Sequence, residues 1–301
     1  MRSAVVDLGT NTFDLIIVEK ESAHNRFQII YTDKSFVSLG QGGINEKRIT
    51  KEAMDRAYFA LEHFIQACTE ENVAKVNIHA FGTSALRDAN NTDEFLSFIK
   101  HHFDLDIKVI KGKEEARYIY EGIKGIHNFR EESCIMDIGG GSTEFIFADK
   151  DGVHQIDSLN IGVSRILQRF DIPNQLTSSK IDEVKEFMNR EAGNIFDTRN
   201  TSVLIGAAGS FETFYQLVTG KTTYDDFSTI EIPFESLKTH LKSLIKSGLT
   251  ERNNNFRIPD YRKKMIHIAA LQTLWVIEKQ KIRRCYFSPA ALKEGVIFSE
   301  V

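Results

Sequence analysis

Cysteine and proline are scarce in this 301-residue sequence, which contains three cysteines and four prolines. The cysteines, Cys68, Cys134 and Cys285, lie far apart and form no Cys-x-x-Cys pair, which excludes a zinc knuckle and a dithiol redox motif. Each has an apolar neighbour in the sequence, a setting typical of buried free thiols in a reducing compartment. Because prolines are few and no Gly/Ser-rich tract occurs, the sequence indicates no flexible linker.

A surplus of basic charge and a long apolar run are also missing. Thirty-eight Lys and Arg residues stand against 42 Asp and Glu residues, and the pI is near 6.2. General nucleic-acid binding needs basic side chains to neutralise phosphates, so it is disfavoured, although a local basic pocket for a small anion is not. No apolar run approaches the ~18 residues of a membrane span. The first seven residues enter a strand pattern without a signal-peptide core. We therefore expect a cytoplasmic protein that binds neither nucleic acid nor membrane.

The remaining composition, 42% hydrophobic and 27% charged, is that of an ordinary globular protein. At roughly 100–200 residues per domain, the length predicts two domains. A weak internal repeat supports this division, because residues 5–18 and 135–148 share one pattern and place Asp7 and Asp137 130 positions apart. In both segments two apolar runs flank a turn of glycines and hydroxyl residues, which predicts a β-hairpin.

Helical and strand spacings of apolar residues alternate outside the two hairpins. The expected helices cover residues 51–68, with Thr50 as the cap, and residues 93–103, 112–125, 161–170, 180–195, 209–218, 235–246 and 263–279. The expected strands outside the hairpins cover residues 76–80, 107–110 and 202–205. Strands interleaved with helices favour a layered α/β fold over a helix bundle or a β-sandwich.

Glycine-rich turns are the first candidates for chemistry. In residues 137–143, glycines leave backbone N–H groups uncovered, so that they can converge on an anion, and the preceding Asp137 suits a divalent cation beside phosphate. One such turn alone is more often a plain hairpin, but two in matching positions favour a phosphate site in a cleft. A third turn, residues 206–210, passes from strand to helix and fits an anion site and a purely structural turn about equally well.

Charged residues near these turns are the next candidates. Glu114 and Glu115 begin a predicted helix, where acidic residues complement the helix dipole, and at most one of two adjacent carboxylates normally faces a cleft as a base. Arg87 could hold a phosphate or pair with a nearby aspartate. Basic clusters at 262–264 and 279–284 fit solvated helix ends, or a landing surface for a long polyanion.

Six segments, taken in order, resemble the exopolyphosphatase / guanosine pentaphosphate phosphatase (Ppx/GppA) family over essentially the whole chain. They are DLGTNTF (7–13), FGTSALRDA (81–89), GKEEAR (112–117), DIGGGSTEF (137–145), NIGVSR (160–165) and GAAGSFET (206–213). The resemblance implies the actin-like ATPase (ASKHA) fold, two ribonuclease-H-like domains with the site in the cleft between them. The expected domains are residues 1–118, joined by a C-terminal helix at about 290–301, and residues 119–289. The chain resembles the short, two-domain form of the family.

Site roles follow from the same resemblance, residue by residue. Glu115 matches the family's proposed catalytic base, and Asp7, Asp137 and Glu144 match acidic positions around Mg²⁺ or another divalent cation. The expected phosphate-binding residues are Gly9, Thr10, Asn11, Thr12, Arg87, Gly139, Gly140, Gly141, Ser142, Thr143, Gly206, Ala207, Ala208, Gly209 and Ser210. Water oriented by Glu115 would attack the terminal phosphorus, and the polymer would lose one orthophosphate.

Three positions depart from the family pattern. Asp14 stands where many members have a basic residue or His, Ala208 replaces a hydroxyl residue, and Lys293 replaces an arginine. A carboxylate at position 14 would repel a polyanion unless it faces away or recruits a cation. Lysine is also a weaker bidentate clamp than arginine.

These departures leave several functions open. The first hypothesis is an exopolyphosphatase that acts on inorganic polyphosphate, and the rival substrate within the same class is the alarmone pppGpp. A polyphosphate- or alarmone-binding sensor with weakened catalysis is a second class. An ATP-dependent kinase or chaperone on the same fold lacks support from the residues, because the GKEEAR segment resembles the phosphatases. The resemblance also leaves a homodimer open.

Overall fold

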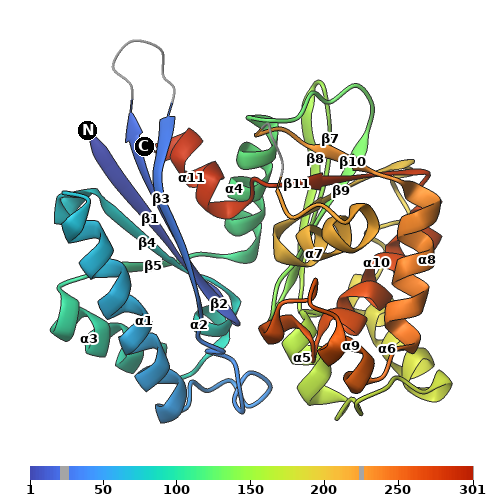
Figure 1. Cartoon of the computed structure of the whole chain (residues 1–301), viewed down its shortest axis with the longest axis horizontal. Coiled ribbons are helices and arrows are strands. Elements are labelled where there is room, and N and C mark those ends of the chain that lie inside the picture. Colours follow the sequence, from blue (N-terminus) through green and yellow to red (C-terminus); the bar gives the residue numbers. More distant parts are fainter. Residues whose placement is uncertain (21–26, 224–226, 301) are drawn as a thin grey trace.

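The computed structural model describes residues 1–20, 27–223 and 227–300 and contains two mixed β-sheets (Figure 1). The first sheet has the strand order β3-β2-β1-β4-β5. Its strands are β1 (Arg2–Leu8), β2 (Thr12–Lys20), β3 (Phe27–Phe36), β4 (Ile78–Gly82) and β5 (Ile107–Val109). The helices of this half are α1 (Lys51–Glu70), α2 (Ser84–Asp88) and α3 (Thr92–Phe103). Thr50 caps α1 as expected, because its side chain accepts a hydrogen bond from the backbone N–H of Ala53.

The second sheet has the strand order β10-β11-β9-β6-β7-β8. Its strands are β6 (Ser133–Ile138), β7 (Thr143–Asp149), β8 (Gly152–Leu159), β9 (Val203–Ala207), β10 (Ile230–Ile232) and β11 (Arg284–Ser288). The helices of this half are α5 (Val163–Arg169), α6 (Ser178–Ala192), α7 (Ala208–Thr219), α8 (Phe234–Lys246), α9 (Leu249–Asn254) and α10 (Ile266–Gln280). None of the helices in the described residues is long and apolar enough to cross a bilayer.

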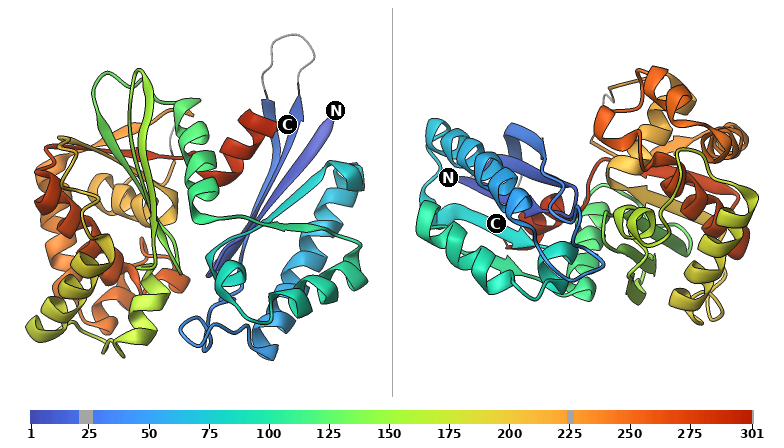
Figure 2. Two further views of the ribbon diagram at one scale, coloured as in Figure 1. Left: turned by 180° about the vertical axis from the view of Figure 1, so that it is seen from behind. Right: turned by 90° about the horizontal axis from the view of Figure 1, so that it is seen from below.

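Two helices, α4 (Gly112–Lys124) and α11 (Leu292–Glu300), lie between the sheets (Figures 1 and 2). Their apolar side chains share one buried cluster with β1, β2, β6 and β7. They pack closely because both have glycine at the contact: a Cβ on Gly295 would lie 1.7 Å from the carbonyl oxygen of Tyr118. The boundary expected at residue 118 therefore falls inside α4, and the division into two domains stays a prediction.

The internal repeat is confirmed in the backbone. In each half an antiparallel hairpin, β1–β2 or β6–β7, is closed by an N–H···O bond of 3.0 Å, from Gly9 to Thr12 and from Gly139 to Ser142. Each hairpin also aligns polar residues across three adjacent strands near its turn. The first row is Asp7, Asp14 and Lys34, and the second row is Asp137, Glu144 and Ser158. The departure at Asp14 therefore occupies the repeat position of Glu144.

Several predicted elements need correction. Val76 belongs to a 3₁₀ turn (Lys75–Asn77) and is exposed, so the strand predicted from residue 76 begins at Ile78. The basic cluster at 279–284 is not one helix end, because α10 stops at Gln280 and Arg284 opens β11. The third strand of each half, β3 and β8, was not expected, since no residue of β3 is buried and only Leu159 of β8 is.

Candidate active site in the cleft

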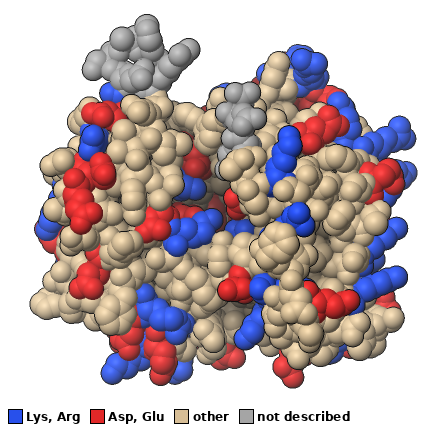
Figure 3. Space-filling view, viewed as in Figure 1, with Lys and Arg blue, Asp and Glu red and all other residues tan. Residues whose placement is uncertain are grey.

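A cleft of about 720 Å³ is lined by residues from both halves. In the space-filling view a hollow lies between the halves, with acidic and basic atoms at its rim (Figure 3). The predicted site residues that line it are Asp7, Gly9, Thr10, Asn11, Thr12, Glu115, Asp137, Gly139, Gly140, Gly141, Ser142, Glu144, Ala208, Gly209 and Ser210. Three turns that lie far apart in the sequence therefore meet at one cavity.

The first two glycine turns touch each other. A Cβ on Gly140 would lie 2.8 Å from the Cβ of Thr10 and 2.7 Å from the amide nitrogen of Asn11, so only glycine allows this approach. The Asn11 side chain also accepts a hydrogen bond of 2.6 Å from Ser164 on α5. The contact fixes the two turns side by side in the wall of the cleft.

In these turns, backbone carbonyl groups accept hydrogen bonds, whereas several backbone N–H groups donate none within the described residues. The carbonyl of Gly140 accepts from the N–H groups of Ser164 and Arg165, and that of Thr10 accepts from Gly40. Among the described residues, no hydrogen bond uses the backbone N–H groups of Thr10, Asn11, Gly140 and Gly141. Free N–H groups in adjacent turns that line a cavity are the donors of an anion-binding nest.

Four residues expected to bind phosphate do not line the cavity. Thr143 is fully buried in β7, while Gly206 and Ala207 lie within β9, where a Cβ on Gly206 would strike the ring of Phe211. Arg87 donates to two residues that do line the cavity, to Glu115 at 2.8 Å and to Ser142 at 3.3 Å. Their phosphate-binding roles stay predictions.

Glu115 is the carboxylate of α4 that faces the cleft, whereas Glu114 pairs with Lys108 at 2.7 Å on the surface. This division confirms that only one of the two adjacent carboxylates faces inward. Burial raises the pKa of Glu115 above its ordinary value, and the charge and hydrogen bond of Arg87 lower it again. The guanidinium of Arg87 therefore favours the ionised carboxylate of Glu115, which is the form that can accept a proton.

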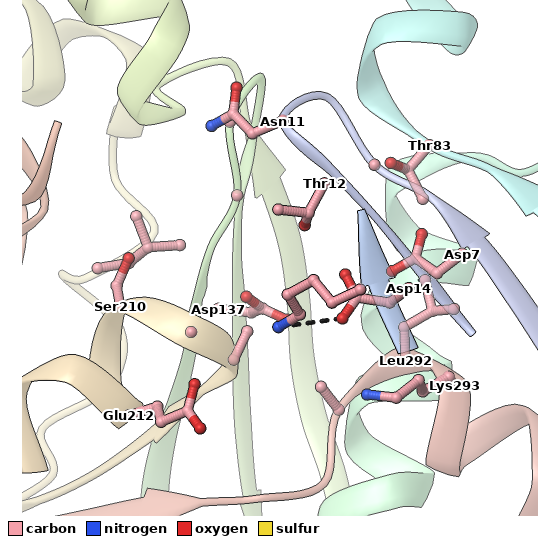
Figure 4. Close-up of a pocket in the computed structure, with 18 of the residues that line it drawn as sticks. Asp7, Asn11, Thr12, Asp14, Thr83, Asp137, Ser210, Glu212, Leu292 and Lys293 are labelled. Carbon is pink, nitrogen blue, oxygen red and sulfur yellow. Dashed lines mark ion pairs between the residues drawn. The ribbon is translucent and has the colours of Figure 1, made fainter. Parts of the chain in front are cut away.

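Asp7 and Asp137 approach the cavity from the two hairpins (Figure 4). Burial is the main cause that raises the pKa of Asp7 well above its usual range and that of Asp137 to about 7, and neighbouring carboxylates raise both further. The Asp7 Oδ1 atom is buried and has no hydrogen-bond partner in the described structure. Mg²⁺ is typically held by one or two carboxylates together with substrate phosphates. Asp7 and Asp137, which lie beside N–H groups suited to bind phosphate, fit this arrangement.

Asp7, Asp137 and Glu144, the three carboxylates expected to hold the cation, all line the cavity, and their metal-binding role stays a prediction. Within the described residues, no three His, Cys, Asp or Glu side chains gather closely enough to hold a metal. Glu144 is 1% exposed, and it accepts a hydrogen bond of 2.7 Å from Ser158. Glu144 is the direct cross-strand partner of Asp137, and its other neighbour, Ser158 in β8, already occupies one of its carboxylate oxygens.

Asp14 faces the cavity and recruits cations. Lys34, its partner on β3, lies 3.0 Å away, and the dashed line in Figure 4 marks this ion pair. Lys293 lies nearby, paired with Glu294 at 3.1 Å, and its charge lowers the pKa of Asp7 and of Asp137. Asp14 therefore does not face away from the cavity, and its negative charge is instead offset by the ammonium group of Lys34.

Some residues of the cavity were not predicted from the sequence. Arg262 and Tyr261 line it beside the third turn, and a Cβ on Gly209 would lie 1.5 Å from the Arg262 guanidinium. Lys34 also lines it. The sequence pattern around Arg262 predicts a solvated helix end or a landing surface for a polyanion. Its proximity to Gly209 depends on a long-range contact that no local pattern reports.

Comparison with known proteins identifies relatives of this chain. The family model of the Ppx/GppA phosphatase family matches residues 16–301. A bifunctional 3-dehydroquinate synthase/phosphatase of Fusobacterium nucleatum is 29% identical over 84% of this chain and 38% of its own length. A guanosine-5'-triphosphate,3'-diphosphate pyrophosphatase of Vibrio atlanticus is 27% identical over 99% of this chain and 59% of its own length. The chain thus spans less than two thirds of these curated relatives.

Among solved structures, an exopolyphosphatase from Cytophaga hutchinsonii superimposes with a TM-score of 0.93 at 29% identity. The match covers 99% of this chain and 97% of that one, which confirms the expected fold class of two α/β halves. Since the family model covers nearly the whole sequence and the fold agrees, the chain belongs to the Ppx/GppA phosphatase family.

Proposed function

We propose that the protein is an exopolyphosphatase, which releases orthophosphate from the end of inorganic polyphosphate. The observation that carries the proposal is the pair of adjacent glycine turns at a cavity that also contains Glu115. In the described part of the chain, these turns leave the N–H groups of Thr10, Asn11, Gly140 and Gly141 without a hydrogen bond. Turns of this kind bind phosphate oxygens, and a partly buried carboxylate can orient water. The likeness to the Cytophaga exopolyphosphatase supports this substrate.

The chemistry assigns one role to each group. The glycine turns hold the terminal phosphate, and Glu115 accepts a proton from a water molecule as its oxygen attacks phosphorus. The bond between phosphorus and the bridging oxygen breaks, so orthophosphate and a polymer shortened by one unit leave. Arg87 positions Glu115 and Ser142. A Mg²⁺ held by Asp7 and Asp137 would neutralise phosphate oxygens when bound.

A second substrate, pppGpp, is favoured by one feature of the cavity. Its lining includes the apolar or aromatic side chains of Ile29, Phe227 and Tyr261. Polyphosphate has no apolar surface to contact them, whereas a nucleoside does. The name of the Vibrio relative points the same way. A sensor with weakened catalysis is the third candidate, and it rests on Asp14 and Ala208.

Orthophosphate release from long-chain polyphosphate and from pppGpp, at matched phosphate-terminus concentrations with Mg²⁺, separates these candidates. We expect faster turnover of polyphosphate. Faster release from pppGpp would replace the substrate, and tight binding of polyphosphate without any release would favour the sensor. The Glu115→Gln variant should lose roughly 10²-fold or more of the turnover, as expected for a general base.

Glu114→Gln is the matched control for this test. It makes the same chemical change one residue earlier in α4, at a side chain that pairs with Lys108 on the surface. Wild-type turnover in Glu114→Gln together with a large loss in Glu115→Gln supports the assignment. Near-native turnover in Glu115→Gln would remove Glu115 from the mechanism.

A further inference from the structure

Arg165, near the start of α5, is a buried arginine that extends from the second half of the chain into the first. It is 8% exposed. Its Nε donates to the carbonyl of Gly141 at 2.8 Å, and its Nη2 donates to the carboxylate of Asp88 at 2.5 Å. Its Nη1 lies 3.4 Å from the carbonyl oxygen of Ile44. All three arms of the guanidinium are therefore occupied by groups of the protein.

The two shortest of these bonds end next to the proposed chemistry. Gly141 belongs to the second glycine turn, which lines the cavity and is proposed to bind phosphate. Asp88 follows Arg87 on α2, and Arg87 bonds Glu115 and Ser142. The guanidinium of Arg165 thus connects the second glycine turn, which would hold phosphate, to α2, which carries Arg87, the partner of Glu115.

We propose that Arg165 is a positioning residue, which keeps the turn at Gly139–Ser142 in register with Arg87 and Glu115 across the cleft. The planar guanidinium presents several N–H groups in a fixed fork, so it can bind a carbonyl and a carboxylate at once. Reaction rates depend steeply on such register, because a displacement of about 1 Å can cost ~10²-fold. Arg165 itself touches no reacting atom.

Asp88→Asn tests this role with little change of shape, since it removes the charge of the partner and keeps its size. We expect kcat for polyphosphate to fall roughly tenfold while KM stays within about twofold, because the groups that bind phosphate remain but are misaligned. Asp88→Glu restores the ion pair and should recover most of kcat. The double variant Arg165→Met/Asp88→Asn should be no slower than Arg165→Met alone, as for two residues that act as one unit.

Gln168→Met is the matched control. Gln168 lies on the same helix and also reaches the first half, with a hydrogen bond of 3.1 Å to the carbonyl of Gly40, but it bonds neither the glycine turn nor α2. Its loss should leave kcat unchanged. A fall in kcat equal to that of Asp88→Asn would mean that any bond between the halves matters, and it would overturn the specific role of Arg165.

A second measurement does not depend on activity, and it separates this inference from the proposed function on which the kinetic test rests. Hydrogen exchange of the full chain without substrate should show faster exchange across residues 139–142 in Asp88→Asn, but not in Gln168→Met. If the wild type releases no phosphate from either substrate, the proposed function fails and the exchange result still decides the role of Arg165. Unchanged exchange at 139–142 in Asp88→Asn overturns the positioning role.

Discussion

At the scale of single residues, the bond between Glu115 and Arg87 controls when the proposed base is available. Glu115 accepts a proton only when it is ionised, so turnover should rise with pH through its raised pKa. Arg87 lowers that pKa, and Arg87→Gln removes the lowering charge. We therefore expect the acid limb of the kcat/KM profile to move to higher pH in Arg87→Gln. An acid limb that stays in place or moves to lower pH would contradict the role of this pair.

A second residue with a measurable effect is His267, which lies in α10 outside the cleft. Both ring nitrogens are buried without a hydrogen-bond partner among the described residues, and burial, with the nearby charge of Arg252, lowers its pKa to about 3. The unfolded chain binds a proton near the ordinary value of ~6.5, so the folded state loses stability as pH falls below that value.

His267→Leu should remove this acid sensitivity. Between pH 6.5 and pH 5 the wild type is expected to lose up to about 2 kcal/mol of unfolding free energy through His267, at about 1.4 kcal/mol per pH unit. Urea unfolding at several pH values measures the slope for both proteins. Above about pH 8 the histidine is almost entirely neutral in both states, so that range provides the internal reference. Equal slopes below pH 6.5 would show that His267 does not contribute.

At the scale of helices and strands, the crossing of α4 and α11 is a tightly packed contact between two backbones. Gly295→Ala would place a Cβ 1.7 Å from the carbonyl of Tyr118, and the helices must separate to accept it. We expect a loss of about 1–3 kcal/mol or more of unfolding free energy, as for an overpacked core. Gly248→Ala is the control, because its Cβ meets nothing closer than 3.9 Å. Equal stability of the two variants in urea would refute the tight crossing.

Element prediction from the sequence succeeded where the signal is local and failed where it depends on neighbours. The hairpins after Asp7 and Asp137 and the cap at Thr50 are short patterns that determine their own geometry. The strand β11 was missed because Arg284 reads as part of a basic helix end. It becomes a strand because β9 and β10 pair with it on both sides.

At the scale of the whole molecule, the cleft should respond to its ligand as one unit. A ligand that binds only the folded state stabilises it by about 2.7 kcal/mol at one hundred times its Kd. We therefore expect tripolyphosphate to raise the Tm of Glu115→Gln, which cannot consume it, and to raise it further with Mg²⁺ than with EDTA. Equal shifts with and without the metal would argue against the cation held by Asp7 and Asp137. No shift in either case would argue against the anion site.

The motifs of the site were predictable from the sequence, but the contacts between segments far apart in the chain were not. Glu115 and the glycine turns follow from motifs in which chemistry and spacing coincide. The bond from Arg165 to Asp88, the cation beside Asp14 and the place of Arg262 each join segments far apart in the chain. Such contacts depend on the register of strands and helices, which a single sequence does not report.

The two polar rows make the electric field in the cleft uneven. The first row contains its own ammonium group, whereas the second row ends in a hydroxyl. Arg87, whose charge also reaches Glu144, is already paired with Glu115. A chain of phosphates is repelled less along the wall formed by β3 than along the opposite one. If the substrate is a long polyphosphate, as proposed, we therefore expect its tail to leave the cleft on the side of Lys34.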